Sequence, residues 1–316
     1  MKVLITGGAG FIGVNLIETL LKKTNWVINV LDNFITSENR LLEEEISNSK
    51  RVKVFNGDIR DADDIVEAME GCTHVVNLAA QAGVISSIKD PFYDMEINVK
   101  GLLNILSSAV DLGIKKVIHA SSNALLGEGE LPLNEKSVPQ PLSPYGASKL
   151  AGEGYLSAWA TSYGLCTVAL RFSSVYGPKS INKGSVIAKF IKQILDNEQI
   201  EIWGDGSQTR DLVYVKDVTN AIYLSIVKDL NKKFEVIHIG TGKEISIQKV
   251  YDTIYEKFLN RGYEPKRVIY KDWKPGEIRK NWSSINKARK VLGFEPNDNF
   301  EENIENTIEW FIKNYK

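Results

Sequence analysis

Short apolar runs alternate with amphipathic segments through the first half of the chain. Helical patterns such as Asp61–Glu70 and Asn98–Leu112 separate these runs. The alternation predicts right-handed crossovers and a parallel sheet that helices cover on both faces. Val75–Leu78 is nearly all apolar, as expected of a strand that is buried on both sides. We therefore predict an α/β fold with a doubly wound parallel sheet, whose strands are Val3–Ile5, Val27–Leu31, Val52–Phe55, His74–Leu78, Lys116–His119 and Cys166–Leu170.

The regular alternation of strand and helix patterns ends at Gly177-Pro178, and the later part of the chain has a different composition. It is richer in Gly, Pro, Lys and aromatic residues, with helical patterns at 216–228 and 246–259 and a strand-like run at Val236–Ile239. We predict that residues 1–178 form the main domain. Residues 179–316 are expected to form mainly a smaller, discontinuous C-terminal domain, with elements near 212–240 returning to the main sheet.

The charges and the cysteines narrow the class of protein. The 316 residues carry 39 Lys and Arg against 40 Asp and Glu, so no basic excess points to nucleic acid. No apolar run approaches the ~20 residues that a membrane helix needs, and a strand follows the N-terminus directly, without a signal-peptide pattern. Cys72 and Cys166 lie far apart and the three histidines are scattered, so no disulfide or metal site is expected. We expect a cytoplasmic protein.

The first strand runs into a glycine-rich turn at residues 7–13. Gly7 permits the sharp turn, Gly10 lets the backbone approach a pyrophosphate, and Gly13 lets the following helix pack closely on the strand. The start of that helix offers free N–H groups and a partial positive charge to phosphates. The order strand, glycine turn and helix predicts a dinucleotide-binding Rossmann domain.

An acidic residue ends the second strand and indicates which dinucleotide is bound. Asp32 can accept hydrogen bonds from an adenosine ribose, and it repels a 2′-phosphate. Asn33-Phe34 follow, without an Arg or Lys to pair with such a phosphate. NAD is therefore favoured over NADP. Asp58-Ile59 follows the third strand, at a place suited to the edge of an adenine.

Tyr145 and Lys149 form the candidate chemistry of the chain. Their spacing of four places the phenol and the ammonium on one helical face, with Ser143 as the cap and Pro144 in the first turn. A free phenol has a pKa of about 10. The Lys cation and a nicotinamide cation both favour the phenolate, which can then take a proton from a sugar hydroxyl. Ser122 follows another strand, at the carboxyl edge where such sheets place their ligands.

Together these segments resemble an extended short-chain dehydrogenase/reductase of the NAD-dependent nucleotide-sugar epimerase/dehydratase family, which includes UDP-glucose 4-epimerase-like enzymes. The resemblance runs nearly from end to end. It rests on motifs that follow one another in the order typical of the family: Gly7–Gly13, Asp32-Asn33, Gly57-Asp58, Asn77–Ala82, Asn98–Gly101, Ala120–Ser122, Ser143–Lys149, Arg171-Phe172, Val175–Pro178, Gly204–Asp211, Gly240–Gly242 and Pro275–Glu277.

The resemblance implies a role for each matching position. Ser122, Tyr145 and Lys149 would be the catalytic triad; Ser122 is preferred to Ser121 because the catalytic residue of the family lies five positions before the glycine that is here Gly127. The residues expected to bind NAD are Gly7, Gly10, Phe11, Ile12, Gly13, Asp32, Asn33, Asp58, Ile59, Ala79, Ala80, Gln81, Asn98, Tyr145 and Lys149. The residues expected to bind a nucleotide-diphosphate sugar are Ser122, Asn123, Ser174, Arg210 and Lys274.

The two residues after Ser122 bear on the reaction. Dehydrating relatives usually carry Asp-Glu there, whereas this chain has Asn123-Ala124, and neither side chain can act as an acid or a base. The resemblance therefore favours a 4-epimerase that acts on a UDP-sugar through a transient 4-keto intermediate. Departures on the substrate side, such as Ser174 for Asn and Lys274 for Arg, keep a specialised dehydratase or a 4-ketoreductase open.

Two other classes of NAD-binding protein differ from the epimerase in testable ways. A reductase that exchanges free NAD(P)H would lose its cofactor on dialysis, and a non-catalytic NAD-sensing module would not need the triad. A homodimer is expected, because the helices near Asn98–Leu112 and Tyr145–Tyr163 correspond to those that pair in dimers of the family. Leu150, Leu156 and Trp159 of the second helix could equally pack on the chain's own sheet.

Overall fold

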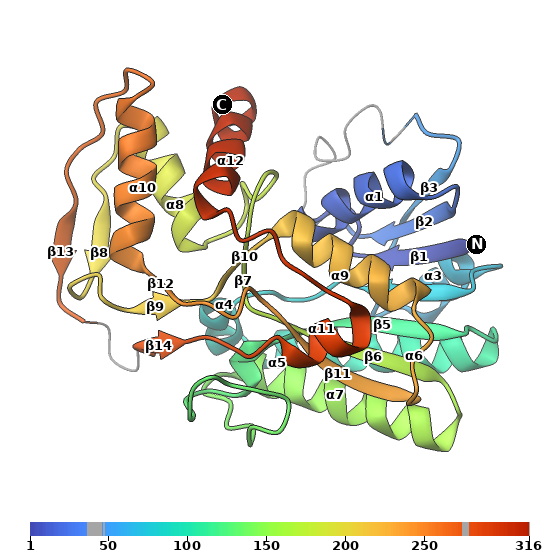
Figure 1. The fold of residues 1–316 in the computed structure, drawn as a ribbon. Helices are drawn as coiled ribbons and strands as arrows, with labels where there is room; N and C mark the ends of the chain where they lie inside the picture. Colours follow the sequence, from blue (N-terminus) through green and yellow to red (C-terminus); the bar gives the residue numbers. More distant parts are fainter. Residues whose placement is uncertain (37–45, 47, 274–277, 316) are drawn as a thin grey trace.

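The computed structural model describes residues 1–36, 46, 48–273 and 278–315 (Figure 1). A sheet of seven strands forms the centre of the molecule, in the order β11-β6-β5-β4-β1-β2-β3, and every pairing in it is parallel. The strands are β1 (Lys2–Thr6), β2 (Val27–Asp32), β3 (Val52–Asn56), β4 (His74–Asn77), β5 (Lys116–Ser122), β6 (Cys166–Phe172) and β11 (Phe234–Ile239). The predicted doubly wound parallel α/β fold is confirmed.

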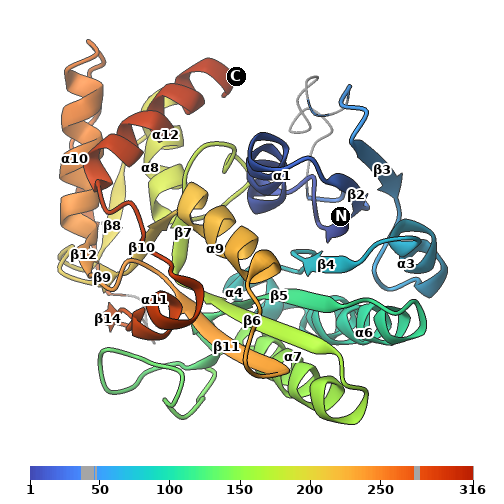
Figure 2. The ribbon, with the colours of Figure 1, turned by 45° about the vertical axis from the view of Figure 1, so that its right-hand side comes forward.

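Helices cover both faces of this sheet (Figure 2). One face carries α1 (Phe11–Lys23) and α9 (Val215–Val227), which contact each other. The other carries α3 (Ala62–Met69), α6 (Leu102–Asp111) and α7 (Pro144–Ser162). The two apolar cores lie on the two sides of the sheet, so every central strand is buried on both faces, as its unbroken apolar sequence requires.

The helix that was expected to start near Asn98 begins earlier. It starts at Pro91 with α5 (Pro91–Met95), passes through a π-helical segment at Glu96–Gly101, and continues as α6. Asp90 caps the start, since its side chain accepts the N–H of Tyr93. Asp followed by Pro is a local start signal that the periodicity of apolar residues does not contain.

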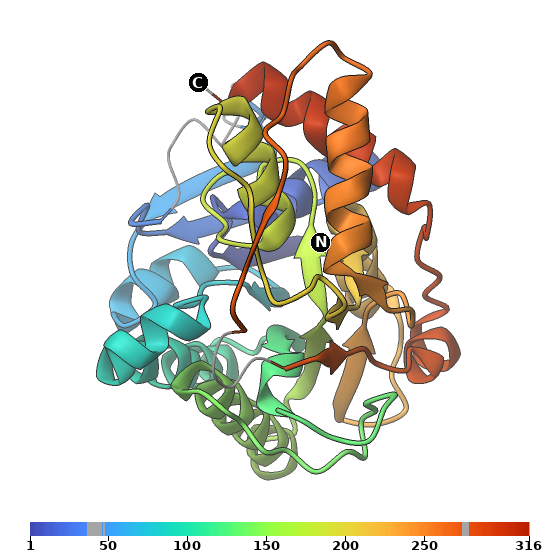
Figure 3. The same ribbon diagram turned by 90° about the vertical axis from the view of Figure 1, so that its left-hand side faces the viewer.

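A second group of elements lies beside the carboxyl end of the sheet (Figure 3). It contains the helices α8 (Val186–Leu195), α10 (Ile247–Leu259) and α12 (Phe300–Asn314), and the parallel pair β8 (Glu201–Trp203) and β13 (Ile269–Lys271). Short strands join it to the main sheet: β7 (Ser174–Tyr176) pairs with β10 (Leu212–Tyr214), and β9 (Thr209–Arg210) lies between β12 (Ile245–Ser246) and β14 (Lys280–Asn281). Between these, α9 and β11 return to the main sheet, where α11 (Asn286–Leu292) contacts both.

Among the described residues, no helix combines the length and the apolar character needed to cross a bilayer.

Candidate active site

The glycine turn after β1 packs against the loop after β4 at the carboxyl edge of the sheet. Gly7 has a φ of +68°, and a Cβ there would lie 2.6 Å from the backbone nitrogen of Ala79. A Cβ on Gly13 would lie 2.5 Å from the carbonyl oxygen of Gly7. Both positions therefore require glycine: the loop after β4 packs directly on Gly7, and Gly13 of α1 packs directly on the turn after β1.

Gly10 has a different reason to be glycine. A Cβ there would meet a single atom within 4 Å, the carbonyl oxygen of Gly7 at 3.2 Å. α1 begins at the next residue, Phe11, and no side chain within the described residues caps it. The first N–H groups of α1 thus stay available to an anion, and the backbone at Gly10 can approach that anion closely.

Asp32 holds the glycine turn as well as ending β2. Its Oδ2 accepts the backbone N–H of Ala9 at 2.9 Å, and its Oδ1 accepts that of Phe34 at 2.9 Å. The carboxylate of Asp32 thus accepts backbone N–H groups on both sides of the end of β2. The first of these contacts ties the turn to the end of β2 and was not anticipated from the sequence.

Asp58 is locked in place by its neighbours. Asn33 donates to its Oδ2 at 2.8 Å, and Arg60 donates to both carboxylate oxygens. The side-chain hydrogen bond from Arg60 is the main cause that lowers the pKa of Asp58 to about 2. Ile59 is buried against Gly101. Arg60 is a member of this cluster that sequence reasoning missed.

Asn98 clamps the loop after β4. Its Oδ1 accepts the N–H of Gln81 at 3.0 Å, and its Nδ2 donates to the Gln81 carbonyl at 3.1 Å. Ser148 Oγ and Asp94 Oδ1 lie 3.2 and 3.0 Å from the same nitrogen. The side chain of Asn98 therefore joins the 79–81 loop to the first turns of α7.

The predicted triad is assembled from β5 and α7. Ser143 caps α7 by accepting the N–H of Gly146, and a Cβ on Gly146 would lie 2.6 Å from the carbonyl oxygen of Ala124. This close approach places Tyr145 beside the end of β5, where burial raises the pKa of its phenol and the side chain of Ser122 acts to lower it. Lys149 Nζ lies 5.7 Å from the centroid of the Tyr145 ring and donates to the carbonyl of Ala120 at 2.8 Å.

Burial governs the protonation of the two ionisable groups. It raises the pKa of Tyr145 above its usual range, and the hydrogen bond with Ser122 acts in the opposite direction. It also lowers the pKa of Lys149 to about 8, against the charge of Asp94. Both groups are thus biased toward their neutral forms, and a bound cation would be needed to favour the phenolate.

A buried polar network lies directly behind the triad. Glu153, on α7, accepts the hydroxyl of Ser121 at 2.6 Å and pairs with Arg171 at 2.7 Å. Arg171 Nη1 lies 3.5 Å from His238 Nε2, and His238 Nδ1 lies 2.7 Å from Asn123 Oδ1. The network links β5, β6, β11 and α7. Sequence reasoning did not assign these residues to the site, apart from Asn123.

Asn123 is enclosed by this network. Its Nδ2 donates to the hydroxyls of Ser173 at 3.0 Å and Ser283 at 2.7 Å, and the residue is 5% exposed. Both amide protons are therefore used within the protein. In this arrangement Asn123 positions the loop after Ser122 and has no proton left to donate to a substrate.

The other expected substrate residues lie apart from the triad. Ser174 and Arg210 line a cavity of about 330 Å³ between β7, α8, β8 and β9, together with Lys189, Phe190 and Trp203. Arg210 Nη1 donates to the carbonyls of Thr209 and Ile278, both at 2.8 Å. Lys274, and the Pro275–Glu277 motif beside it, lie outside the described residues.

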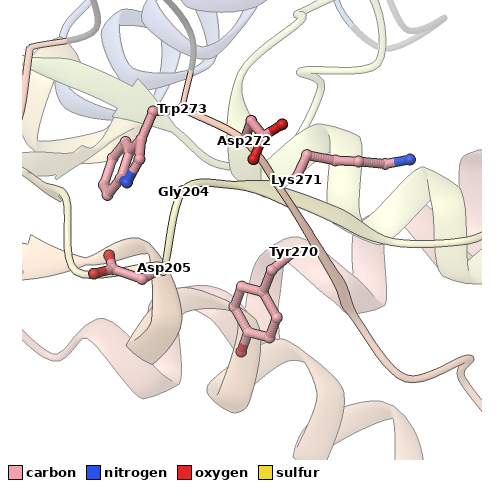
Figure 4. Close-up of a pocket in the computed structure, with 6 residues that line it drawn as sticks. All are labelled: Gly204, Asp205, Tyr270, Lys271, Asp272 and Trp273. Carbon is pink, nitrogen blue, oxygen red and sulfur yellow. The ribbon is translucent and has the colours of Figure 1, made fainter.

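A shallow hollow of about 480 Å³ lies beyond this cavity, between the end of β8 and β13 (Figure 4). Trp273 packs against Gly204, where a Cβ would lie 2.5 Å from its ring, and the guanidinium of Arg279 lies 3.0 Å from the ring centroid. Tyr270 and Asp205 face the hollow, while the side chain of Lys271 points away from Trp273. No residue of the predicted triad reaches it.

Among the described residues, no group of three His, Cys, Asp or Glu side chains could hold a metal ion.

The chain matches the model of the NAD dependent epimerase/dehydratase family over residues 3–240. It belongs to this family. Its members are enzymes that depend on NAD, and the predicted cofactor is confirmed at the level of the family.

Individual relatives agree with this membership. The chain is 38% identical over 317 residues to a protein of Methanocaldococcus jannaschii provisionally named UDP-glucose 4-epimerase, with 99% of each chain covered. The UDP-glucose 4-epimerase of Thermotoga maritima, solved with UDP-glucose, has a TM-score of 0.91 at 33% identity and full coverage of both chains. The UDP-glucuronic acid 4-epimerase of Bacillus cereus, solved with UDP-glucuronic acid and NAD, has a TM-score of 0.91 at 28% identity, again with full coverage.

Proposed function

We propose that this protein is an NAD-dependent nucleotide-sugar 4-epimerase that acts on a UDP-sugar through a transient 4-keto intermediate. The observation that carries the proposal is that Ser122, Tyr145 and Lys149 lie together at the end of β5 and the start of α7. The names of the similar proteins support a UDP-sugar as substrate.

The residues present fit a dinucleotide. The open backbone at Gly10 and the uncapped start of α1 suit a diphosphate, and the carboxylate of Asp32 suits a ribose. Asn33, Asp58 and Ile59 would border the adenine, and Ala79, Ala80, Gln81 and Asn98 the nicotinamide half. Lys149 would donate to the nicotinamide ribose. When bound, NAD supplies the acceptor, and later the donor, of a hydride.

Each residue of the triad then has one task. Tyr145 takes the proton of the sugar 4-hydroxyl as the hydride leaves C4, and it returns a proton when the hydride comes back to the other face. Ser122 hydrogen-bonds the same oxygen and the phenol. Lys149 supplies positive charge beside the ring, so its protonated form favours the phenolate that burial otherwise opposes.

Substrate binding falls to the second group of elements. We propose that Arg210, Ser174 and Lys274 hold the diphosphate of the nucleotide, because a guanidinium matches a diphosphate with paired hydrogen bonds. The cavity lined by Ser174 and Arg210 would take the nucleotide, with Trp203 and Phe190 as its apolar walls. In this interpretation residues 1–178, with α9 and β11, bind NAD, and most of residues 179–316 bind the substrate.

A dehydratase or a 4-ketoreductase is the competing interpretation, since the family includes dehydratases. Elimination of water needs further acid and base groups near the sugar. The two positions after Ser122 hold Asn123, whose amide is enclosed, and Ala124. This observation favours the epimerase, and the triad argues against a module that only senses NAD.

The test incubates purified protein with a panel of UDP-sugars, without added NAD, and follows the configuration at C4 by NMR. Inversion at C4, with NAD still bound after dialysis, supports the proposal. The variant Y145F is the matched control and should leave the sugars unchanged. Unchanged sugars across the panel with the wild-type protein would refute the epimerase, and a 4-keto-6-deoxy product would identify a dehydratase.

We further propose a homodimer formed through α7 and the helices that precede α6. Phe92, Met95, Tyr155 and Tyr163 are exposed there, at 76%, 44%, 37% and 59%. Leu156 is buried against the chain's own sheet and takes no part in the proposed dimer.

The two cysteines are free, which supports a reducing compartment such as the cytoplasm.

A further inference from the structure

The segment 177–185, here called the strap, connects β7 to α8 and lies on α1. Asn15 of α1 donates to the Pro178 carbonyl at 3.1 Å, and Lys179 pairs with Glu18 of α1 at 2.6 Å. Asn182 donates to the carbonyl of Thr36 at 2.9 Å. A segment from the later part of the chain is therefore fastened to the helix that starts at the glycine turn.

Lys183 extends from this strap toward the start of α1. Its Nζ lies 5.4 Å from the centroid of the Phe11 ring, and Phe11 is the first residue of α1. The same nitrogen donates to the carbonyl of Val175. Both neighbours are neutral, and the described residues show no carboxylate paired with this ammonium. Burial lowers its pKa to about 8, with no second cause.

An ammonium that is partly shielded from water and faces no anion is unfavourable by itself. It lies next to a helix N-terminus that no side chain caps and beside a backbone that leaves room for an anion at Gly10. Two sources of positive potential, the start of α1 and Lys183, thus meet at one place. A compact anion with several acceptor oxygens would complement these two sources of positive potential.

We propose that Lys183 donates to the diphosphate of bound NAD, so that the strap closes over the cofactor and slows its release. This inference rests on the proposed function, and it adds a contact from the strap to the cofactor, whose binding is otherwise assigned to residues 1–178 with α9 and β11. A nucleotide sugar also carries a diphosphate, and the neighbouring residues Gly184 and Ser185 line the cavity with Ser174 and Arg210. The position of Nζ over Phe11 favours the diphosphate of the cofactor.

The experiment measures the exchange of bound NAD for isotopically labelled NAD in the purified holoenzyme. Loss of a charge-assisted hydrogen bond should make exchange about tenfold faster in K183M. K183R keeps the charge and should exchange close to the wild-type rate. K192M is the matched control: Lys192 donates to the Ile181 carbonyl of the same strap but does not face Phe11, so its exchange should change by less than about twofold.

A second measurement distinguishes a contact of Lys183 with the diphosphate of NAD from a contact with the diphosphate of the nucleotide sugar. Calorimetry of UDP binding to the NAD-loaded protein should give nearly the same affinity for K183M as for the wild type. A fall in UDP affinity with unchanged NAD exchange would overturn the inference and assign Lys183 to the substrate. Unchanged values in both measurements would overturn it as well.

The failure of this inference and that of the proposed function can be told apart. The wild-type protein alone tests the inversion at C4, whereas NAD exchange in K183M tests the strap. If K183M is poorly folded by circular dichroism, K183Q replaces it, since it keeps a polar side chain of similar length. A K183Q protein that folds and exchanges NAD at the wild-type rate would refute the contact.

Discussion

The ion pair between Glu153 and Arg171 fixes α7 against the sheet and can be tested by removing the cation. Arg171 Nη2 lies 2.7 Å from Glu153 Oε2, and Arg171 Nε lies 2.9 Å from Oε1. The side chains are only 5% and 6% exposed. Glu153 is one helical turn beyond Lys149, and its Oε1 also accepts the hydroxyl of Ser121, the neighbour of Ser122. The variant R171M leaves this carboxylate buried without a cation.

The expected loss of stability follows from this burial. Removing one partner of a buried pair costs about 3–5 kcal/mol, because the remaining charge stays out of water. For 316 residues the entropy of unfolding is about 0.7 kcal/mol per degree, so the midpoint of thermal unfolding should fall by about 5–8 °C. The double variant E153Q/R171M removes both charges and keeps an oxygen for the hydroxyl of Ser121. It should recover about half of this loss or more.

Thermal unfolding by calorimetry measures both variants, with K249M as the control. Lys249 pairs with Glu301 at 3.0 Å, but the two side chains are 56% and 62% exposed. Its loss should cost at most about 1 kcal/mol, or about 1–2 °C. The reasoning is refuted if R171M melts within that range of the wild type. It is refuted too if the double variant melts below R171M, because an unpaired buried charge would then not be the cause.

Three further predictions address the triad, the pH dependence and the glycine turn. Y145F should lower kcat/KM by about 10²- to 10⁴-fold, which is the usual contribution of a general acid–base group. The absorbance of NAD in the dialysed protein should stay unchanged. Activity near that of the wild type would exclude Tyr145 as the base. Burial lowers the pKa of His238 from 6.5 to about 3 in the folded protein. As the pH falls, the unfolded chain therefore binds a proton at this histidine before the folded protein does. The free energy of unfolding should decrease as the pH falls from 6.5 toward 3. H238N should reduce that slope in urea unfolding by up to about 1.4 kcal/mol per pH unit, and an unchanged slope would contradict the assignment. G7A should unfold with at least about 1 kcal/mol less stability and lose bound NAD, because its Cβ would lie 2.6 Å from the Ala79 nitrogen at a φ of +68°; a G7A protein that keeps its NAD would show that the turn can adjust.

The sequence by itself determined the fold class, the family and the type of cofactor. The signals involved are local: the alternation of apolar runs, the glycines at residues 7, 10 and 13, and the spacing of Tyr145 and Lys149 on one helical face. The start of the helix at Pro91 was missed, because it depends on the cap at Asp90 and not on apolar periodicity.

Only the tertiary structure decided which side chains stand around these groups. Arg171 is 67 residues from His238, and Lys179 is 161 residues from Glu18, yet each pair is in contact. No local pattern encodes such pairs, because they form when distant strands and loops come to the same edge of the sheet. For this reason the sequence predicts Asn123 as a substrate contact, although the fold encloses its amide. The sequence likewise does not distinguish Lys183 from other lysines, although the fold places its charge over the first residue of α1.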